Sequence, residues 1–157
     1  MRIACAFDHA GVPLRDAVLS ALGEAGHQVL DAGDAEDYPQ SARAVAVAIL
    51  DGQAERGVLV CGSGAGVSVA ASKVRGIRAA TVSDCYTAHQ SVEHDDLNVL
   101  CLGARVTGPE LARELVRIFA NAQFSGAARH VRRLAEVAVL ERDGVDAPET
   151  ARRKAAT

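Results

Sequence analysis

Residues 57–82 have the sequence GVLVCGSGAGVSVAASKVRGIRAATV, which combines four structural signals in one stretch. The apolar run at 57–61 predicts a buried strand, and a glycine-rich loop follows it. Residues 67–73 then show helical periodicity, and 76–82 predicts a second strand. Two strands joined through a helix pair in parallel with a right-handed crossover. This stretch therefore predicts an α/β fold built on a parallel sheet.

The same alternation of short apolar runs and helical periodicity continues on both sides of this stretch. Gly26 and Pro39 mark element boundaries, because glycine favours helix ends and proline favours first helical turns. The alternation implies parallel pairing with helices on both faces of the sheet. The further strands are expected at 3–7, 29–30 and 99–102, and the further helices at 14–25, 39–50, 86–93, 109–123 and 127–142.

The composition is that of one globular domain with few aromatic side chains. Of the 157 residues, 49% are hydrophobic and 24% are charged, whereas only 3% are aromatic and 31 are alanine. Ligands that stack on aromatic rings are therefore disfavoured, and polar groups and backbone should hold any ligand. The net charge of -3 gives no reason to expect a nucleic-acid partner. No apolar run is long enough to span a bilayer, so no membrane association is expected.

The four cysteines show no C-x-x-C spacing and follow no secretion signal. A zinc site or a disulfide framework is therefore not expected, and a reducing, cytoplasmic location is the simplest interpretation.

The last 30 residues differ in charge from the rest of the chain. Residues 127–142 have helical periodicity but carry four arginines. Arg129 and Arg133 are four residues apart and share a helix face, where two guanidinium groups could hold a phosphate or dock a partner. A solvated surface is the alternative interpretation. The domain is expected to cover 1–143, and the tail 144–157, which has no apolar face, is expected to be disordered.

The loop CGSGAG at 61–66 is the strongest local signal for a ligand site. Its glycines let the backbone approach a ligand, and the following helix N-terminus offers free N–H groups to an anion. A dinucleotide fingerprint is the alternative: Asp84 resembles its ribose-binding acid, but position 67 is Val instead of the last Gly. A phosphate-binding P-loop is excluded, because no G-K-[ST] closes the motif.

Cys61 lies where the strand at 57–61 meets this loop. A helix N-terminus favours the thiolate form of cysteine, which can remove a proton or attack a carbonyl. The alternative is a small apolar core residue, as expected for Cys5 and Cys101 inside strands.

Two polar segments could complete a site with Cys61. Asp8 and His9 follow the first strand, and loops at the carboxyl ends of parallel strands share one crevice. Asp8 could equally cap the helix that follows, which would not explain His9. His94, in the sequence EHDD at 93–96, could exchange protons near neutral pH, or it could be solvated.

Taken together, these segments resemble the type B ribose-5-phosphate isomerase family, which includes allose-6-phosphate and galactose-6-phosphate isomerase subunits. The resemblance extends over residues 1–142 and implies a Rossmann-like, three-layer α/β/α fold with a five-stranded parallel sheet. It also implies a homodimer, or a tetramer, with active sites shared between subunits. The reaction would interconvert an aldose phosphate and a ketose phosphate without metal or cofactor. The resemblance rests on FDHAG (7–11), DYP (37–39), CGSGAGVSVAASKVRGIRA (61–79), HDDLNVLCLGARVTG (94–108) and RHVRR (129–133).

By this resemblance, Cys61 is the base that moves a proton between C2 and C1 through an enediolate. Ser63 and the backbone amides of the loop would hold the oxyanion, and His94 would open the furanose ring. Asp8 would assist at a sugar hydroxyl. The loop positions concerned are Gly62, Gly64, Ala65 and Gly66.

The resemblance assigns the phosphate to four cationic side chains, some of them from the partner chain. Tyr38 corresponds to a residue that lines the pocket. The phosphate-binding residues would be His9, Arg105, Arg129 and Arg133.

The sequence departs from the family pattern beside the ring-opening histidine. Asp95 stands where an asparagine is usual, and an ionised aspartate accepts hydrogen bonds but cannot donate one to the substrate. Asp95 must therefore be protonated, turned away, or serve a different sugar. Ribose 5-phosphate is the expected substrate. A tetrose such as erythrulose 4-phosphate, a hexose such as allose or galactose 6-phosphate, and a non-catalytic sugar-phosphate-binding module are the alternatives.

Overall fold

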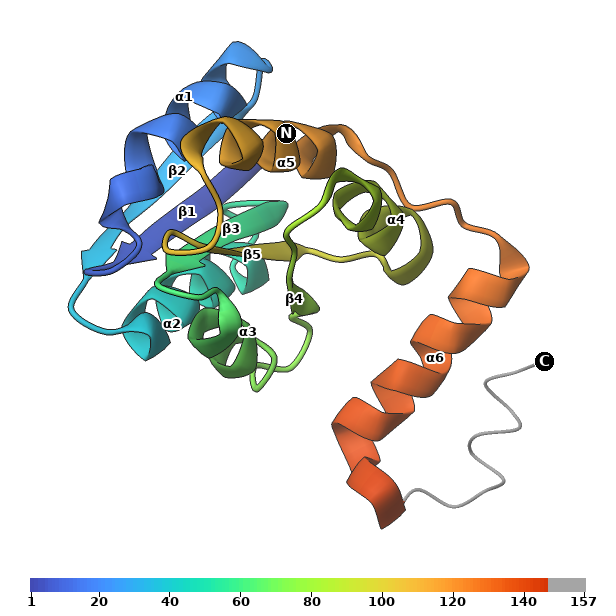
Figure 1. Cartoon of the computed structure of the whole chain (residues 1–157). Helices are drawn as coiled ribbons and strands as arrows, with labels where there is room; N and C mark the ends of the chain where they lie inside the picture. The colour runs from blue at the N-terminus through green and yellow to red at the C-terminus, as the bar shows by residue number, and fades with distance from the viewer. Residues whose placement is uncertain (147–157) are drawn as a thin grey trace.

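The computed structural model describes residues 1–146 and has a five-stranded sheet between two layers of helices (Figure 1). The strand order is β2-β1-β3-β5-β4, and every neighbouring pair is parallel. This confirms the expected Rossmann-like α/β/α fold. The strands are β1 (Arg2–Asp8), β2 (Gln28–Ala35), β3 (Arg56–Cys61), β4 (Ala79–Thr81) and β5 (Val99–Gly103).

The helices cover the sheet unequally. Apolar residues of α1, α4 and α5 form one core with one face of the sheet, and those of α2 and α3 form a second core with the other face. A short 3-10 turn, η1 (Val12–Leu14), precedes α1. The helices are α1 (Arg15–Glu24), α2 (Tyr38–Leu50), α3 (Ala65–Ala71), α4 (Cys85–Asp95), α5 (Pro109–Asn121) and α6 (Ala128–Asp143).

Strand β1 shows why a chain so rich in alanine folds this way. Successive side chains of a strand point to opposite faces, so Ile3 and Phe7 enter the core under α1 and α5. Ala4 and Ala6 face α2 and α3, and both are buried. Small residues on that face let the two helices approach the sheet closely.

The two edge strands differ from the sequence prediction. β2 covers eight residues instead of the two predicted, because an edge strand with polar residues such as Asp31 and Asp34 lacks a continuous apolar run. β4 covers three residues instead of the seven predicted at 76–82. Gly76 has a φ of 86° and belongs to the turn before the strand.

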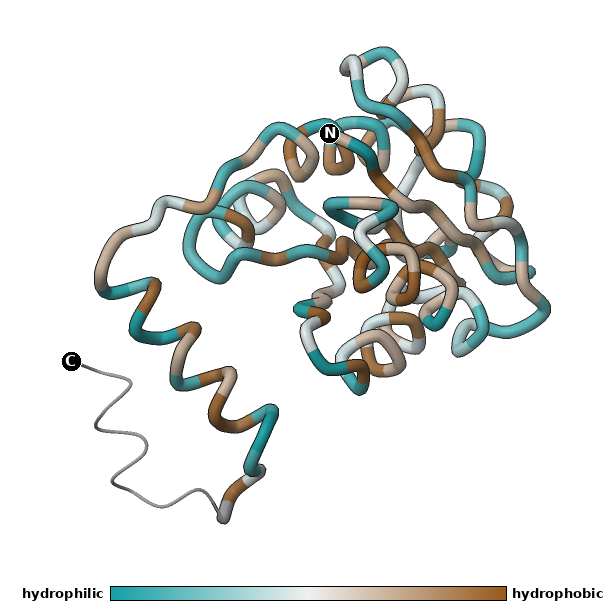
Figure 2. Tube along the Cα trace, turned by 180° about the vertical axis from the view of Figure 1, so that it is seen from behind, coloured by the Kyte–Doolittle hydropathy of each residue, from teal (hydrophilic) through white to brown (hydrophobic). Residues whose placement is uncertain are grey.

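α6 extends away from the sheet as an arm (Figures 1 and 2), and among the described elements it contacts α4 and the 3-10 turn η2 (Gly144–Asp146). Hydrophobic and hydrophilic residues alternate around it in Figure 2, and Val131, Val137 and Leu140 are exposed. The predicted tail 144–157 thus begins with an ordered turn, and its remainder lies outside the described residues. Within residues 1–146, none of the helices has the length and apolar character needed to cross a membrane.

Candidate active site

A cavity of about 350 Å³ opens at the carboxyl ends of β1, β3 and β5, the strands at the centre of the sheet. The chain reverses its direction across the sheet between β1 and β3, which is where ligands bind in open parallel sheets. Eight of the residues predicted for the site therefore meet here. They are Asp8, His9, Tyr38, Cys61, Gly62, Ser63, Gly66 and Arg105.

Cys61 is the last residue of β3, and its side chain is buried at the base of the loop. The backbone N–H of Gly64 donates a hydrogen bond to Sγ of Cys61 at 3.1 Å. Gly64 has a φ of 82°, and a Cβ there would lie 2.7 Å from Cγ2 of Thr81. Glycine at this position therefore permits both the left-handed turn and the bond to the thiol.

The loop at 61–66 is fixed by the segment that follows β5. The N–H of Ala104 donates to the carbonyl of Cys61 at 2.8 Å, and the N–H of Arg105 donates to that of Gly62 at 2.9 Å. Gly103 permits this approach, because a Cβ there would lie 2.4 Å from the carbonyl carbon of Ser63. The loop is thus held rigidly beside Arg105.

Asp8 is buried, and its carboxylate belongs to the turn after β1. Oδ1 accepts the N–H groups of Ala10 and Gly11, each at 2.9 Å. Asp8 thus closes the turn before the helix but does not cap it, because the N-cap position of η1 is Gly11 and no side chain bonds there. The capping role considered from the sequence is therefore wrong, and Asp8 also lines the cavity.

His9 presents one nitrogen to the cavity. Its Nδ1 lies 2.7 Å from the carbonyl oxygen of Glu36, which can only accept, so Nδ1 carries a proton. Nε2 is then the atom left for a ligand. The ring of Tyr38 lines the same cavity and packs against Gly66, where a Cβ would lie 3.2 Å from the ring.

Of the other predicted residues, Gly64 and Ala65 belong to the loop at 61–66, and the last four lie at the other edge of the sheet. α4 begins after β4 at the carboxyl edge and runs back, so His94 and Asp95 at its end lie near the start of β5. A strand of five or six residues spans about 15–20 Å. Arg129 and Arg133 are on the α6 arm beyond α4 (Figure 1). One chain therefore does not bring these four residues to Cys61.

His94 and Asp95 form a second polar cluster with α6. The ring centroids of His94 and His130 lie 4.1 Å apart, and Gln90 Nε2 lies 2.9 Å from Nδ1 of His94. A groove of about 930 Å³ beside the arm is lined by Asp95 and Arg133.

His130 belongs to the same polar cluster, and the sequence analysis did not single it out. Its Nδ1 bonds with Oγ of Ser125 at 2.7 Å, and its Nε2 accepts from Nε of Arg129 at 3.0 Å. Burial lowers the pKa of His130, and the positive charges of His94 and Arg129 lower it further. The signal in the sequence was its position inside RHVRR, between the two arginines of one helix face.

The dinucleotide alternative does not fit the structure. Asp84 accepts the N–H of Thr87 at 2.8 Å as the N-cap of α4, and these bonds lower its pKa. Asp84 follows β4, and β5 lies between β4 and β3 in the sheet. In a dinucleotide-binding fold, the ribose-binding acid belongs to the strand next to the one that carries the glycine loop. Among residues 1–146, no cluster of three His, Cys, Asp or Glu side chains has a geometry that could hold a metal ion.

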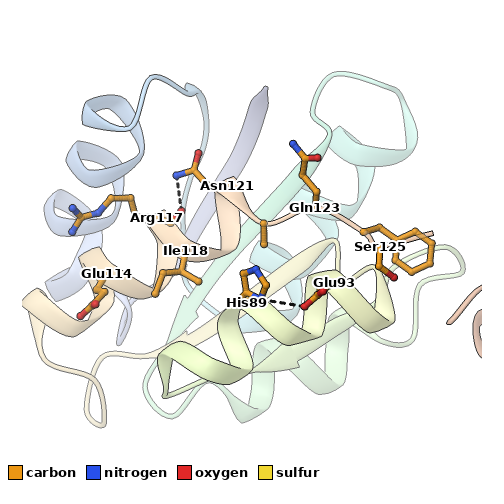
Figure 3. A pocket seen from close by; sticks show the side chains of 10 residues that line it. His89, Glu93, Glu114, Arg117, Ile118, Asn121, Gln123 and Ser125 are labelled. Carbon is orange, nitrogen blue, oxygen red and sulfur yellow. Dashed lines mark hydrogen bonds and ion pairs between the residues drawn. The ribbon is translucent and has the colours of Figure 1, made fainter. Parts of the chain in front are cut away.

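Another cavity, of about 780 Å³, lies between α4, α5 and the connector to α6 and is larger than the cavity beside Cys61 (Figure 3). His89 and Glu93 line it, with Nδ1 of His89 lying 3.4 Å from Oε2 of Glu93. It does not include the carboxyl ends of the strands.

Comparisons with known proteins agree with this geometry. The family model described as Ribose/Galactose Isomerase matches residues 3–137. Ribose-5-phosphate isomerase B of Escherichia coli is 40% identical over 144 residues, which are 89% of this chain and 96% of that protein. D-erythrulose-4-phosphate isomerase of Pectobacterium atrosepticum is 39% identical over 131 residues, 80% of this chain and 86% of that protein. The structure of type B ribose 5-phosphate isomerase from Trypanosoma cruzi has a TM-score of 0.86 and 39% identity, covering 90% of this chain and 98% of that one.

Proposed function

The chain belongs to the ribose/galactose isomerase family, a family of sugar phosphate isomerases, and we propose that it interconverts ribose 5-phosphate and ribulose 5-phosphate. The observation that carries this proposal is the buried Cys61 thiol in a cavity shared with Asp8, His9 and Arg105. The cavity offers a base, backbone N–H groups and cations, which are the groups that an aldose–ketose isomerisation of a phosphate ester requires.

In the proposed mechanism, the Cys61 thiolate removes the proton on C2 of the open-chain aldose. The C–H electron pair forms the C1–C2 double bond, and the carbonyl oxygen becomes an enediolate oxygen. Ser63 and the N–H groups of the loop stabilise that charge, and one well-placed donor contributes about 3–4 kcal/mol. The O2 hydroxyl proton passes to the enediolate oxygen on C1, and the thiol returns its proton to C1 as O2 becomes the ketone oxygen. The guanidinium group of Arg105 and the imidazole of His9 would hold the phosphate.

The proposal includes a homodimer in which each active site takes residues from both chains. Within one chain, His94, Asp95, Arg129 and Arg133 lie at the opposite edge of the sheet from Cys61. The α6 arm carries exposed apolar residues next to its arginines, which suits an interface. A partner's arm could therefore bring His94 to the sugar ring and the two arginines to the phosphate.

The choice of pentose is supported by the identity to the Escherichia coli enzyme, but the relatives include an erythrulose-4-phosphate isomerase at nearly the same identity. A four-carbon substrate is therefore the second candidate, and Asp95, which stands where the family usually has asparagine, is the residue to test for substrate choice. A cytosolic location belongs to the same proposal and is supported by the four free cysteines.

The test is conversion of four-, five- and six-carbon sugar phosphates in the presence of a chelator. We expect the highest kcat/KM with ribose 5-phosphate, and we expect Cys61→Ser to lower kcat by about 100-fold or more. In D2O, Cys61→Ser should also lose deuterium incorporation at C1 of ribulose 5-phosphate. The matched control is Cys85→Ser, which replaces a half-buried thiol at the start of α4. Full turnover by Cys61→Ser would remove Cys61 as the base, and inactivity of the wild type on every sugar phosphate would reject the function.

A further inference from the structure

His94 is held at one ring nitrogen by a side chain of its own helix. Gln90 lies four residues earlier on α4, so both side chains are on one face of the helix. Nε2 of Gln90 lies 2.9 Å from Nδ1 of His94, and both side chains are half-buried.

This bond decides which nitrogen of His94 carries the proton. An amide nitrogen donates, so Nδ1 of the neutral ring is the acceptor and Nε2 carries the hydrogen. When the ring takes up a second proton, Nδ1 becomes a donor, and a half-turn of the Gln90 amide presents its oxygen as the acceptor. Glutamine can therefore hold the ring in one orientation through a complete cycle of proton exchange at Nε2.

The other groups around His94 do not compete for Nδ1. The nitrogens of His130 are used by Ser125 and Arg129, so His130 contributes only its ring face, at 4.1 Å. Oε2 of Glu93 lies 3.8 Å from Nε2 of His94. That carboxylate is nearer to His89, at 3.4 Å.

The surrounding charges are mixed in sign. Negative charge comes from Glu93 and Asp95 on α4, and positive charge comes from Arg129 and Arg133 on α6. Of these charges, the Glu93 carboxylate 3.8 Å from Nε2 favours a proton on that nitrogen, which is the same tautomer that the bond from Gln90 to Nδ1 sets.

We propose that Gln90 is a positioning residue for His94, which holds the ring at Nδ1 and leaves Nε2 as the nitrogen that exchanges a proton with the substrate. The inference rests on the proposed function, in which His94 opens the sugar ring, and it adds the residue that prepares His94 for this step. Gln90 would touch no substrate atom and act only through His94.

The direct test is the tautomer of His94, read from nitrogen chemical shifts of the intact protein labelled with 15N-histidine. The wild type should show a protonated Nε2 and an unprotonated Nδ1. Gln90→Leu should give a mixture of tautomers, because leucine fills the space without a hydrogen bond. Gln90→Glu should move the proton to Nδ1, because a carboxylate only accepts. The His94→Asn spectrum identifies the His94 signals.

Kinetics separate positioning from general damage. Gln90→Leu should lower kcat for ribose 5-phosphate by about tenfold, the loss expected for one neutral hydrogen bond. Deuterium exchange into ribulose 5-phosphate, an open-chain ketose, should change by less than about twofold, because it needs Cys61 but no ring opening. The matched control is Gln53→Leu, which replaces an exposed glutamine between α2 and β3 and should change neither rate.

The outcomes distinguish this inference from the proposed function. A wild type without isomerase activity rejects the function, whereas the spectra still test the Gln90 bond. The inference is overturned if Gln90→Leu and Gln90→Glu leave the His94 signals unchanged, or if both rates fall together. If Gln90→Leu does not fold, Gln90→Glu alone decides through the position of the proton.

Discussion

The rings of His94 and His130 lie 4.1 Å apart, with 34° between their planes, and they join the end of α4 to the α6 arm. His130 is buried, whereas His94 is about one-quarter exposed. His130 is therefore packed inside this contact, whereas the His94 side chain remains accessible from outside the chain.

The buried His130 makes stability depend on pH. Burial and the neighbouring positive charges lower the pKa of His130 in the folded chain, whereas the unfolded chain has the ordinary value near 6.5. Below that value the unfolded state binds a proton that the folded state does not, so the free energy of unfolding falls as the pH falls. His130→Gln should reduce the loss in Tm between about pH 7.5 and about pH 5.5. His89→Gln, at an exposed site, should leave that loss as it is in the wild type, and an equal loss in all three proteins would contradict this assignment.

Mixing two inactive variants tests the shared active site. Cys61→Ser and His94→Asn homodimers should each lack one essential group at both sites. A mixed dimer should contain one complete site, made from Cys61 of one chain and His94 of the other. Random pairing after unfolding and refolding together should restore about a quarter of the wild-type activity. Activity at the level of the separate variants would show that both residues act within one chain.

Asp95→Asn tests whether Asp95 selects the substrate. Asparagine can donate a hydrogen bond to an enediolate oxygen, whereas an ionised aspartate repels it. We expect kcat/KM for ribose 5-phosphate to rise by about tenfold, since a bond to a charged group contributes about 1.5–3 kcal/mol. The rates for erythrose 4-phosphate, measured in the same panel, should rise less. A uniform change across all sugars would indicate that Asp95 does not discriminate between them.

Two glycine substitutions separate a constrained position from an open one. Gly64→Ala places a Cβ 2.7 Å from Cγ2 of Thr81, at a φ of 82°. It should cost about 1–3 kcal/mol of stability and lower kcat. Gly23→Ala in α1 meets no atom of residues 1–146 within 4 Å, and should stabilise the fold by about 0.5–1 kcal/mol. Denaturant unfolding measures both, and equal effects would contradict the role given to the Gly64 turn.

The sequence by itself determined the α/β class, the central strands and the residues around Cys61. Those strands are buried on both faces, so they appear as continuous apolar runs, and the glycine-rich loop is a local signal that can be recognised in the sequence. The edge strands β2 and β4 were predicted with wrong lengths. Polar residues interrupt the apolar pattern of β2, so its prediction was too short, whereas the prediction for β4 included the turn at Gly76 and was too long.

Only the tertiary structure decided which site residues lie together. Asp8 and Cys61 meet because β1 and β3 are neighbours in the sheet, although 53 residues separate them along the chain. His94 is nearer to Cys61 in sequence but lies at the opposite edge, because α4 runs antiparallel to the strands. Its contacts with Gln90 and His130 likewise depend on how α4 and α6 pack. Spacing along the chain predicts which groups a site can use, whereas the direction of each element determines which edge of the sheet they reach.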